Sequence, residues 1–83
     1  MRTEYITFRS VTPAQRAQRI LRQVGMDTIL QRTPRWMEER GCGYCLRLRS
    51  GDVQQAVAVL NQQQVAFSKV YTTADGEPEE RLL

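Results

Sequence analysis

The chain has 83 residues, of which 41% are apolar and 25% charged, and its formal net charge is +3 at pH 7. This length suits one domain and excludes two, and the composition is typical of a folded, soluble chain. No run approaches the roughly 18 apolar residues of a membrane span, and the N-terminal residues lack the apolar region of a signal peptide, so we expect a cytoplasmic protein without membrane contact. The absence of histidine excludes the common catalytic triads and the usual neutral-pH proton shuttle.

Charge is unevenly distributed along the chain. Residues 1–73 hold eleven basic side chains, ten of them arginine, against five acidic ones, whereas residues 74–83 hold four acidic side chains and one arginine. We therefore expect one domain over residues 1–73 and a flexible acidic tail over residues 74–83. An excess of guanidinium groups favours anionic ligands, although a solvated basic surface is the simpler explanation of the same composition.

The first predicted elements are a strand and a helix. Residues 4–8 are rich in β-formers and predict the strand. Thr12 and Pro13 predict the N-cap and the first position of the helix, which Gly25 ends. The apolar side of this helix is predicted to consist of Ala14, Ala17, Ile20, Leu21 and Val24.

The second half of the chain repeats this arrangement. Residues 28–32 predict a strand, and residues 33–43 predict an irregular connection that contains proline and two glycines. Residues 44–49 alternate between apolar and polar side chains, which is typical of a half-buried strand. A helix with an apolar stripe over residues 53–60 and a last strand over residues 65–72 complete the pattern.

The element order β-α-β-β-α-β predicts a ferredoxin-like plait. Each helix links two strands through a right-handed crossover, so both helices pack on one face of a four-stranded antiparallel sheet. The other face stays open. By alternation, we expect this open face to carry Cys45, Arg47 and Arg49, together with Lys69 and Tyr71.

Cys42 and Cys45 form a Cys-Gly-Tyr-Cys segment with the spacing of thioredoxin-type redox motifs. In those motifs the first cysteine begins a helix, whereas here a strand pattern follows. In an extended chain the two Cα atoms would lie about 10 Å apart, beyond the roughly 7 Å limit of a disulfide. Cys45 is therefore either a resolving thiol or a small residue that fills a strand position. A structural zinc site needs four ligands, so we predict no metal and no cofactor.

A single reactive thiol at Cys42 is the other interpretation of this segment. Its flanking glycines leave the sulfur accessible and let backbone N–H groups, including that of Gly43, point at an anion. Arg35 is close in sequence, and Arg32 and Arg47 are candidates for closeness in space. Positive charge raises the thiolate fraction, and a thiolate can carry sulfur or selenium as a persulfide or selenosulfide. A tight turn without chemistry remains the alternative.

Several short motifs follow one another in the order strand, helix, strand and cysteine. They are Phe8-Arg9-Ser10, Ala14, Gly25, Thr33-Pro34-Arg35 and Cys42-Gly43, with an apolar strand after them. In these motifs the chain resembles the selenium/sulfur (Se/S) carrier protein-like family of small bacterial domains, over roughly residues 4–72. The resemblance implies a thiol at Cys42 that accepts and hands on sulfur or selenium. The chain departs from the family pattern at Cys45, where we expect a small residue without a thiol.

We therefore predict a carrier or delivery protein rather than an enzyme, with sulfur or selenium donor and acceptor proteins as partners. Cys42 would hold the adduct, and Arg35 and the Gly43 N–H would hold the thiolate or an incoming anion. One alternative is a binding module that uses a basic face for nucleic acid, a small ligand or a protein; its residues would be Arg32, Arg47, Arg49, Lys69 and Tyr71. Nucleic acid is disfavoured because the central strands lack paired aromatics. A Cys-x-x-Cys redox protein and a homodimer formed through sheet edges are further predictions.

Overall fold

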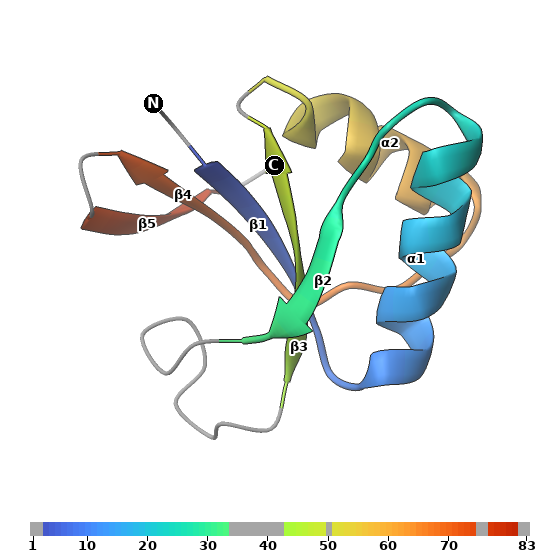
Figure 1. Ribbon diagram of the computed structural model, residues 1–83, viewed down its shortest axis with the longest axis horizontal. Helices are drawn as coiled ribbons and strands as arrows, with labels where there is room; N and C mark the ends of the chain where they lie inside the picture. The colour runs from blue at the N-terminus through green and yellow to red at the C-terminus, as the bar shows by residue number, and fades with distance from the viewer. Residues whose placement is uncertain (1–2, 34–42, 50, 75–76, 82–83) are drawn as a thin grey trace.

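The computed structural model describes residues 3–33, 43–49, 51–74 and 77–81 (Figure 1). These residues form two helices and five strands. In chain order they are β1 (Thr3–Phe8), α1 (Val11–Gln23), β2 (Ile29–Arg32), β3 (Tyr44–Arg49), α2 (Val53–Gln62), β4 (Val70–Ala74) and β5 (Glu77–Arg81).

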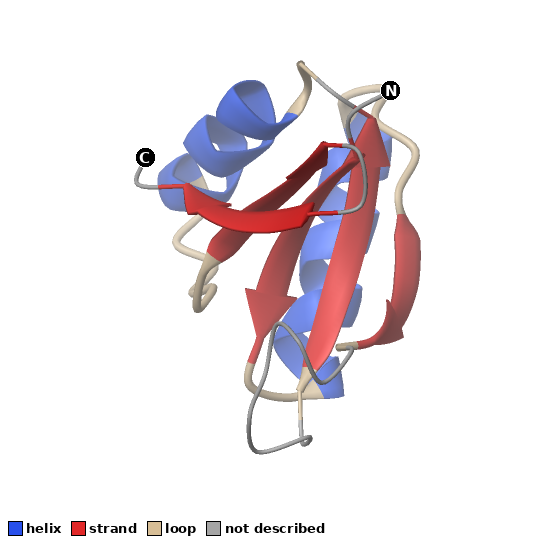
Figure 2. Ribbon diagram, turned by 90° about the vertical axis from the view of Figure 1, so that its left-hand side faces the viewer, coloured by secondary structure: helices blue, strands red, loops and turns tan. Residues whose placement is uncertain are grey.

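The strands form one antiparallel sheet in the order β2-β3-β1-β4-β5. Both helices lie on the same side of this sheet, and Figure 2 shows them behind the strands. The first four strands and the two helices have the element order and the spatial order of a ferredoxin-like α+β plait, as the sequence predicts. Neither of the two described helices covers the opposite face of the sheet.

The core lies between the sheet and the helices. Ile6 and Phe8 of β1 and Leu46 of β3 are almost fully buried there. The helical side of the core consists of Ala14, Ala17 and Leu21 from α1 and of Val53, Ala56, Val57 and Leu60 from α2. The helical spacing in the sequence predicts these positions correctly, with Val24 as the exception. Val24 is 48% exposed because α1 ends at Gln23, so this residue no longer follows the helical spacing.

The start of α1 and the start of the last predicted strand differ from expectation. Ser10, not Thr12, occupies the N-cap of α1, so Thr12 lies inside the helix. The strand predicted over residues 65–72 begins only at Val70. The residues before it run past the end of β1 and meet it at one point, where the Ser68 N–H donates to the Thr7 carbonyl (2.7 Å) and the Thr7 N–H donates to the Lys69 carbonyl (2.8 Å).

The C-terminal segment is a strand where the sequence predicts a flexible acidic tail. Residues 77–81 pair with β4 in a register that places Glu77 opposite Ala74 and Arg81 opposite Val70. An edge strand leaves a row of backbone N–H and C=O groups unpaired, and a following segment of almost any composition satisfies them. Asp75 and Gly76, which separate the two strands in the sequence, are a common hairpin signal that predicts this pairing.

Candidate functional site

The segment predicted to hold the reactive thiol is only partly described. Cys42 and Arg35 lie outside the described residues, and the description resumes at Gly43. The Gly43 carbonyl accepts a hydrogen bond from the Thr33 N–H at 3.0 Å, immediately beyond the paired ends of β2 and β3. Gly43, the residue joined to Cys42 by a peptide bond, therefore has a fixed backbone position at one end of the sheet.

We name this end of the sheet the Gly43 end; β1 and β2 finish there and β3 begins there. Tyr44 lies opposite Phe8 on one side and opposite Arg32 on the other. The Arg32 guanidinium lies over the Tyr44 ring, 5.9 Å from its centroid, which is a cation–π contact. Of the arginines proposed from the sequence, Arg32 is thus held beside the start of β3.

Arg47 and Arg49 lie elsewhere. Arg32 and Tyr44 lie opposite each other in the register and therefore share one face of the sheet. Arg47 follows Tyr44 by three residues along β3, and side chains alternate between the two faces, so Arg47 lies on the other face. Arg49 is at the far end of the strand, about 17 Å from Tyr44 at the usual rise per residue. Arg32 and Arg47 therefore lie on different faces of the sheet. Their predicted closeness to Cys42 lies outside the described residues.

Cys45 is fully buried, although it belongs to the face of the sheet that no helix covers. In the sheet register it lies between Thr7 and Gln31 on the two neighbouring strands, and Thr33 packs against it. The prediction that Cys45 lies on the open face is confirmed by the register, but its side chain is buried there. Alternation along a strand determines which face a side chain joins, whereas its exposure depends on the neighbours on both sides.

The environment of Cys45 makes its thiol a poor nucleophile. Burial raises the pKa of the Cys45 thiol, and this effect outweighs hydrogen bonding by the Thr33 and Gln31 side chains and the charge of Arg47, which all lower it. Since the thiolate is the reactive form, Cys45 is disfavoured as an attacking thiol at neutral pH.

The open face carries an aromatic and basic row that the sequence analysis describes only in part. The register aligns Tyr71, Tyr5, Arg47 and Ile29 across β4, β1, β3 and β2. Arg47 is exposed, and both tyrosines are half-buried. The sequence prediction includes Tyr71 and Arg47 but not Tyr5, which links them. The alternation of Tyr5 with the buried Ile6 is the signal that places it on this face.

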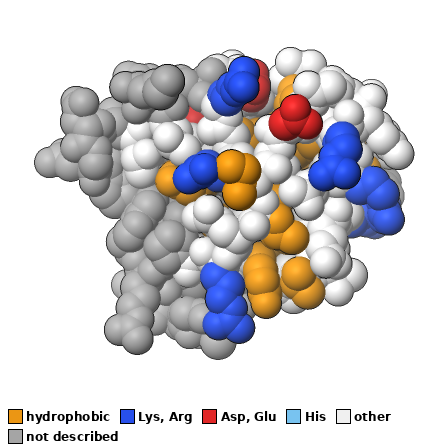
Figure 3. All heavy atoms as spheres, in the orientation of Figure 1, with side chains coloured by type: hydrophobic (Ala, Val, Ile, Leu, Met, Phe, Trp, Pro, Cys, Tyr) orange, Lys and Arg blue, Asp and Glu red, His pale blue; other side chains and the backbone are white. Residues whose placement is uncertain are grey.

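The described basic side chains do not merge into one patch on the side of the molecule shown in Figure 3. The lysine and arginine side chains appear there as separate groups, divided by apolar and uncharged polar atoms. This view favours several local anion contacts over one extended basic surface. Lys69, whose backbone N–H donates to the Thr7 hydroxyl (3.0 Å), is fixed near the Gly43 end.

Glu4 is the buried acidic residue of the core face, and its role is structural. It is 2% exposed and lies at the end of the sheet opposite Gly43. Its Oε1 accepts from the Gly51 N–H (3.2 Å) and its Oε2 from the Thr72 hydroxyl (3.4 Å). These bonds fasten the turn before α2 to the sheet. The described residues contain no group of three or more potential metal ligands.

Comparison with known proteins gives one match. Residues 4–72, most of the chain, match the model of the family described as "Putative Se/S carrier protein-like". No curated protein and no solved structure matches the chain. Within the described part of the chain, neither helix has the length and hydropathy needed to cross a bilayer.

Proposed function

Since the chain belongs to the Se/S carrier protein-like family, we propose that it carries sulfur or selenium covalently on the thiol of Cys42. The family implies donor and acceptor proteins as partners in general. The observation that supports Cys42 is the burial of Cys45, because the chain has two cysteines and the side chain of Cys45 has no exposed surface. A carrier thiol must meet the sulfur of a donor and then of an acceptor, which an enclosed thiol does not do.

Charge at the Gly43 end supports this proposal. The Arg32 guanidinium lies over Tyr44 at the start of β3, and the backbone of Lys69 is bonded to Thr7 near the end of β1. Cations near a thiol favour the thiolate and also favour the persulfide anion, which is ionised at neutral pH. We assign to Arg35 and to the Gly43 N–H the task of holding this anion.

Mass spectrometry of the intact chain tests the proposal. The protein is incubated with a cysteine desulfurase and cysteine, and without reductant. We expect a gain of about 32 Da, one sulfur atom, in the native sequence and in Cys45→Ser, and no gain in Cys42→Ser. The two variants are matched because each removes one sulfur and leaves the other cysteine. An adduct that forms on Cys45 and not on Cys42 would overturn the assignment.

The same samples test the redox alternative. A Cys-x-x-Cys couple would appear as a loss of two hydrogens from the intact chain under mild oxidation, with neither cysteine open to alkylation. The enclosed position of Cys45 disfavours this result. A disulfide that forms quantitatively and is reduced reversibly would favour the redox function over the carrier function.

A second candidate function follows from the row on the open face. Tyr5 and Tyr71 lie opposite each other with Arg47 as the next neighbour, and aromatic rings beside arginine are the usual platform for unpaired bases. Fluorescence polarisation with labelled single-stranded RNA at low and moderate salt measures this binding. If Tyr5→Leu and Arg47→Gln leave the affinity unchanged, the open face does not bind RNA. Homodimer formation remains a prediction.

A further inference from the structure

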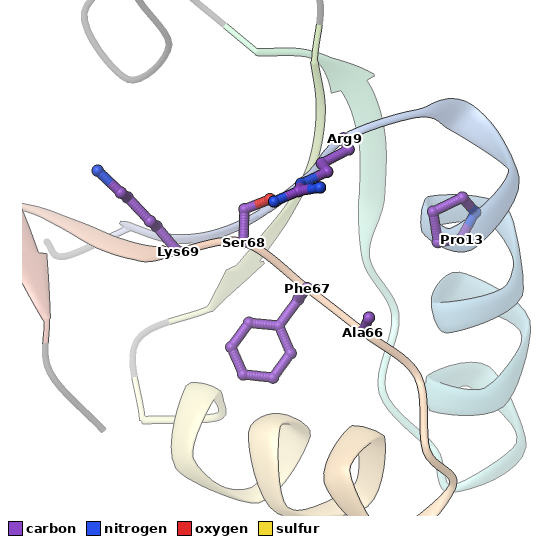
Figure 4. Close-up of a pocket in the computed structure, with 6 residues that line it drawn as sticks. All are labelled: Arg9, Pro13, Ala66, Phe67, Ser68 and Lys69. Atoms are coloured by element: carbon purple, nitrogen blue, oxygen red, sulfur yellow. The ribbon is translucent and has the colours of Figure 1, made fainter.

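A hollow opens near the Gly43 end of the sheet, at the point where the chain leaves β1 and enters α1 (Figure 4). Its volume is about 460 Å³. The residues that line it are Arg9, Pro13, Ala66, Phe67, Ser68 and Lys69. They come from the end of β1, the first turn of α1 and the extended segment that precedes β4.

The walls of this hollow are fixed. The extended segment is tied at both ends: the Val65 N–H donates to the Leu60 carbonyl (2.9 Å), and the Ser68 N–H donates to the Thr7 carbonyl (2.7 Å). Between these ties, Phe67 is partly buried against the hydrophobic core and also lines the hollow. A ligand would therefore find a largely preformed surface, which lowers the entropic cost of binding.

The lining combines positive charge with apolar surface. Arg9 is exposed and has no hydrogen bond or ion pair with any other described residue, and Figure 4 shows its side chain extending beside Ser68. The described lining contains no acidic residue. A guanidinium fork and a serine hydroxyl suit a planar or tetrahedral oxyanion, whereas Pro13 and Phe67 suit a hydrophobic group.

The size of the hollow decides between an inorganic ion and an organic one. Its volume falls in the range of about 300–1,000 Å³ that small-molecule sites occupy. A phosphate or sulfate ion would contact Arg9 and leave the apolar surface of Phe67 and Pro13 exposed to water. An anion that also carries an aromatic or branched aliphatic group would cover both surfaces at once.

We propose that this hollow binds a small organic anion, with its oxyanion head on Arg9 and Ser68 and its apolar group against Phe67 and Pro13. The site consists of described residues and does not depend on the carrier function of Cys42. Its position near the Gly43 end would bring such an anion to the part of the fold where β3 begins.

Titration of the ¹⁵N-labelled full chain with benzenesulfonate, followed by ¹H–¹⁵N correlation spectra, tests the inference. We expect saturable shifts confined to the amides around residues 9–13 and 66–69, with a Kd on the order of 1 mM for so small a ligand. Benzenesulfonamide, which keeps the ring and lacks the charge, should bind at least about tenfold more weakly, and so should inorganic sulfate, which lacks the ring.

Two variants that each remove one positive charge distinguish binding in this hollow from a general effect of the net charge of the chain. Arg9→Gln should weaken benzenesulfonate binding about tenfold or more. Arg22→Gln, on an exposed position near the other end of α1, should leave the affinity unchanged. Equal effects of the two variants, equal binding of the sulfonamide, or shifts that do not saturate would each overturn the proposal. Because no readout involves sulfur transfer, loss of the carrier function and loss of this site are distinguishable.

Discussion

In a Cys42→Ser variant, Cys45 is the remaining thiol, and its rate of alkylation by iodoacetamide measures how often the chain exposes this sulfur. The folded chain leaves Cys45 no exposed surface, and β1 and β2 pair with the strand on both sides of it. Alkylation therefore requires at least a local opening that uncovers this side chain. Its rate should equal the rate of the unfolded chain multiplied by the small fraction of molecules that are open.

The expected magnitude follows from the size of the domain. An 83-residue chain with the usual stability per residue has a free energy of unfolding of about 4–12 kcal/mol. At the lower limit of this free energy, about one molecule in 10³ is globally unfolded and exposes Cys45. Partial opening at the short strand β2 is less costly, so we expect Cys45 to react at least about 100-fold more slowly in the folded chain than in urea.

The assay follows alkylation by intact mass under pseudo-first-order conditions, with and without urea. Cys45→Ser, in which Cys42 is the remaining thiol, serves as the matched control and should react in the folded chain at least as fast as in urea, because the proposed neighbouring cations raise its thiolate fraction. If Cys45 in the folded Cys42→Ser variant reacts within about tenfold of its unfolded rate, the enclosure of this thiol is wrong. The assignment of the carrier role by exclusion would then lose its basis.

Three further predictions concern stability, measured by urea denaturation. Because burial raises the pKa of the folded-state Cys45 thiol, the resulting stabilisation is complete below the unfolded-state pKa of about 8.5 and is lost as the pH rises through the folded-state pKa. Stability should therefore fall as the pH rises above about 8.5, and Cys45→Ala should reduce this fall. Glu4→Ala leaves the Gly51 N–H and the Thr72 hydroxyl without their carboxylate and should cost about 1–3 kcal/mol, whereas Thr72→Val should cost less. Ile6→Ala removes a fully buried side chain from the central strand and should cost about 2–5 kcal/mol, and a cost below 1 kcal/mol would contradict the described core.

The plait is predictable from the sequence because its apolar spacing and its turn residues agree. Ala14, Ala17 and Leu21 recur at helical intervals, and all three are buried against the sheet. Strand ends are less predictable. The segment before Val70 has the composition of a strand, yet among the described residues only Ser68 and Lys69 bond to β1, and both bond to the single residue Thr7.

The hollow could not be predicted from the sequence, because it depends on contacts between distant residues. Arg9 and Ser68 are brought together by the hydrogen bonds of Thr7 with the segment before β4, and no local pattern specifies that register. The same reason applies to Tyr5. Its place in the row with Tyr71 and Arg47 follows from the pairing of three strands and not from its own neighbours in the chain.

The depth of Cys45 illustrates why the two thiols of a Cys-x-x-Cys spacing need not act together. Tyr44 and Cys45 are held extended by Phe8 and Thr7 on one side and by Arg32 and Gln31 on the other. A disulfide requires Cα atoms closer than about 7 Å, whereas an extended separation of three residues spans about 10 Å. Any movement of the Cys45 backbone toward a second thiol would break ladder hydrogen bonds between β3 and its two neighbouring strands. The proposed one-thiol function requires no such movement of β3.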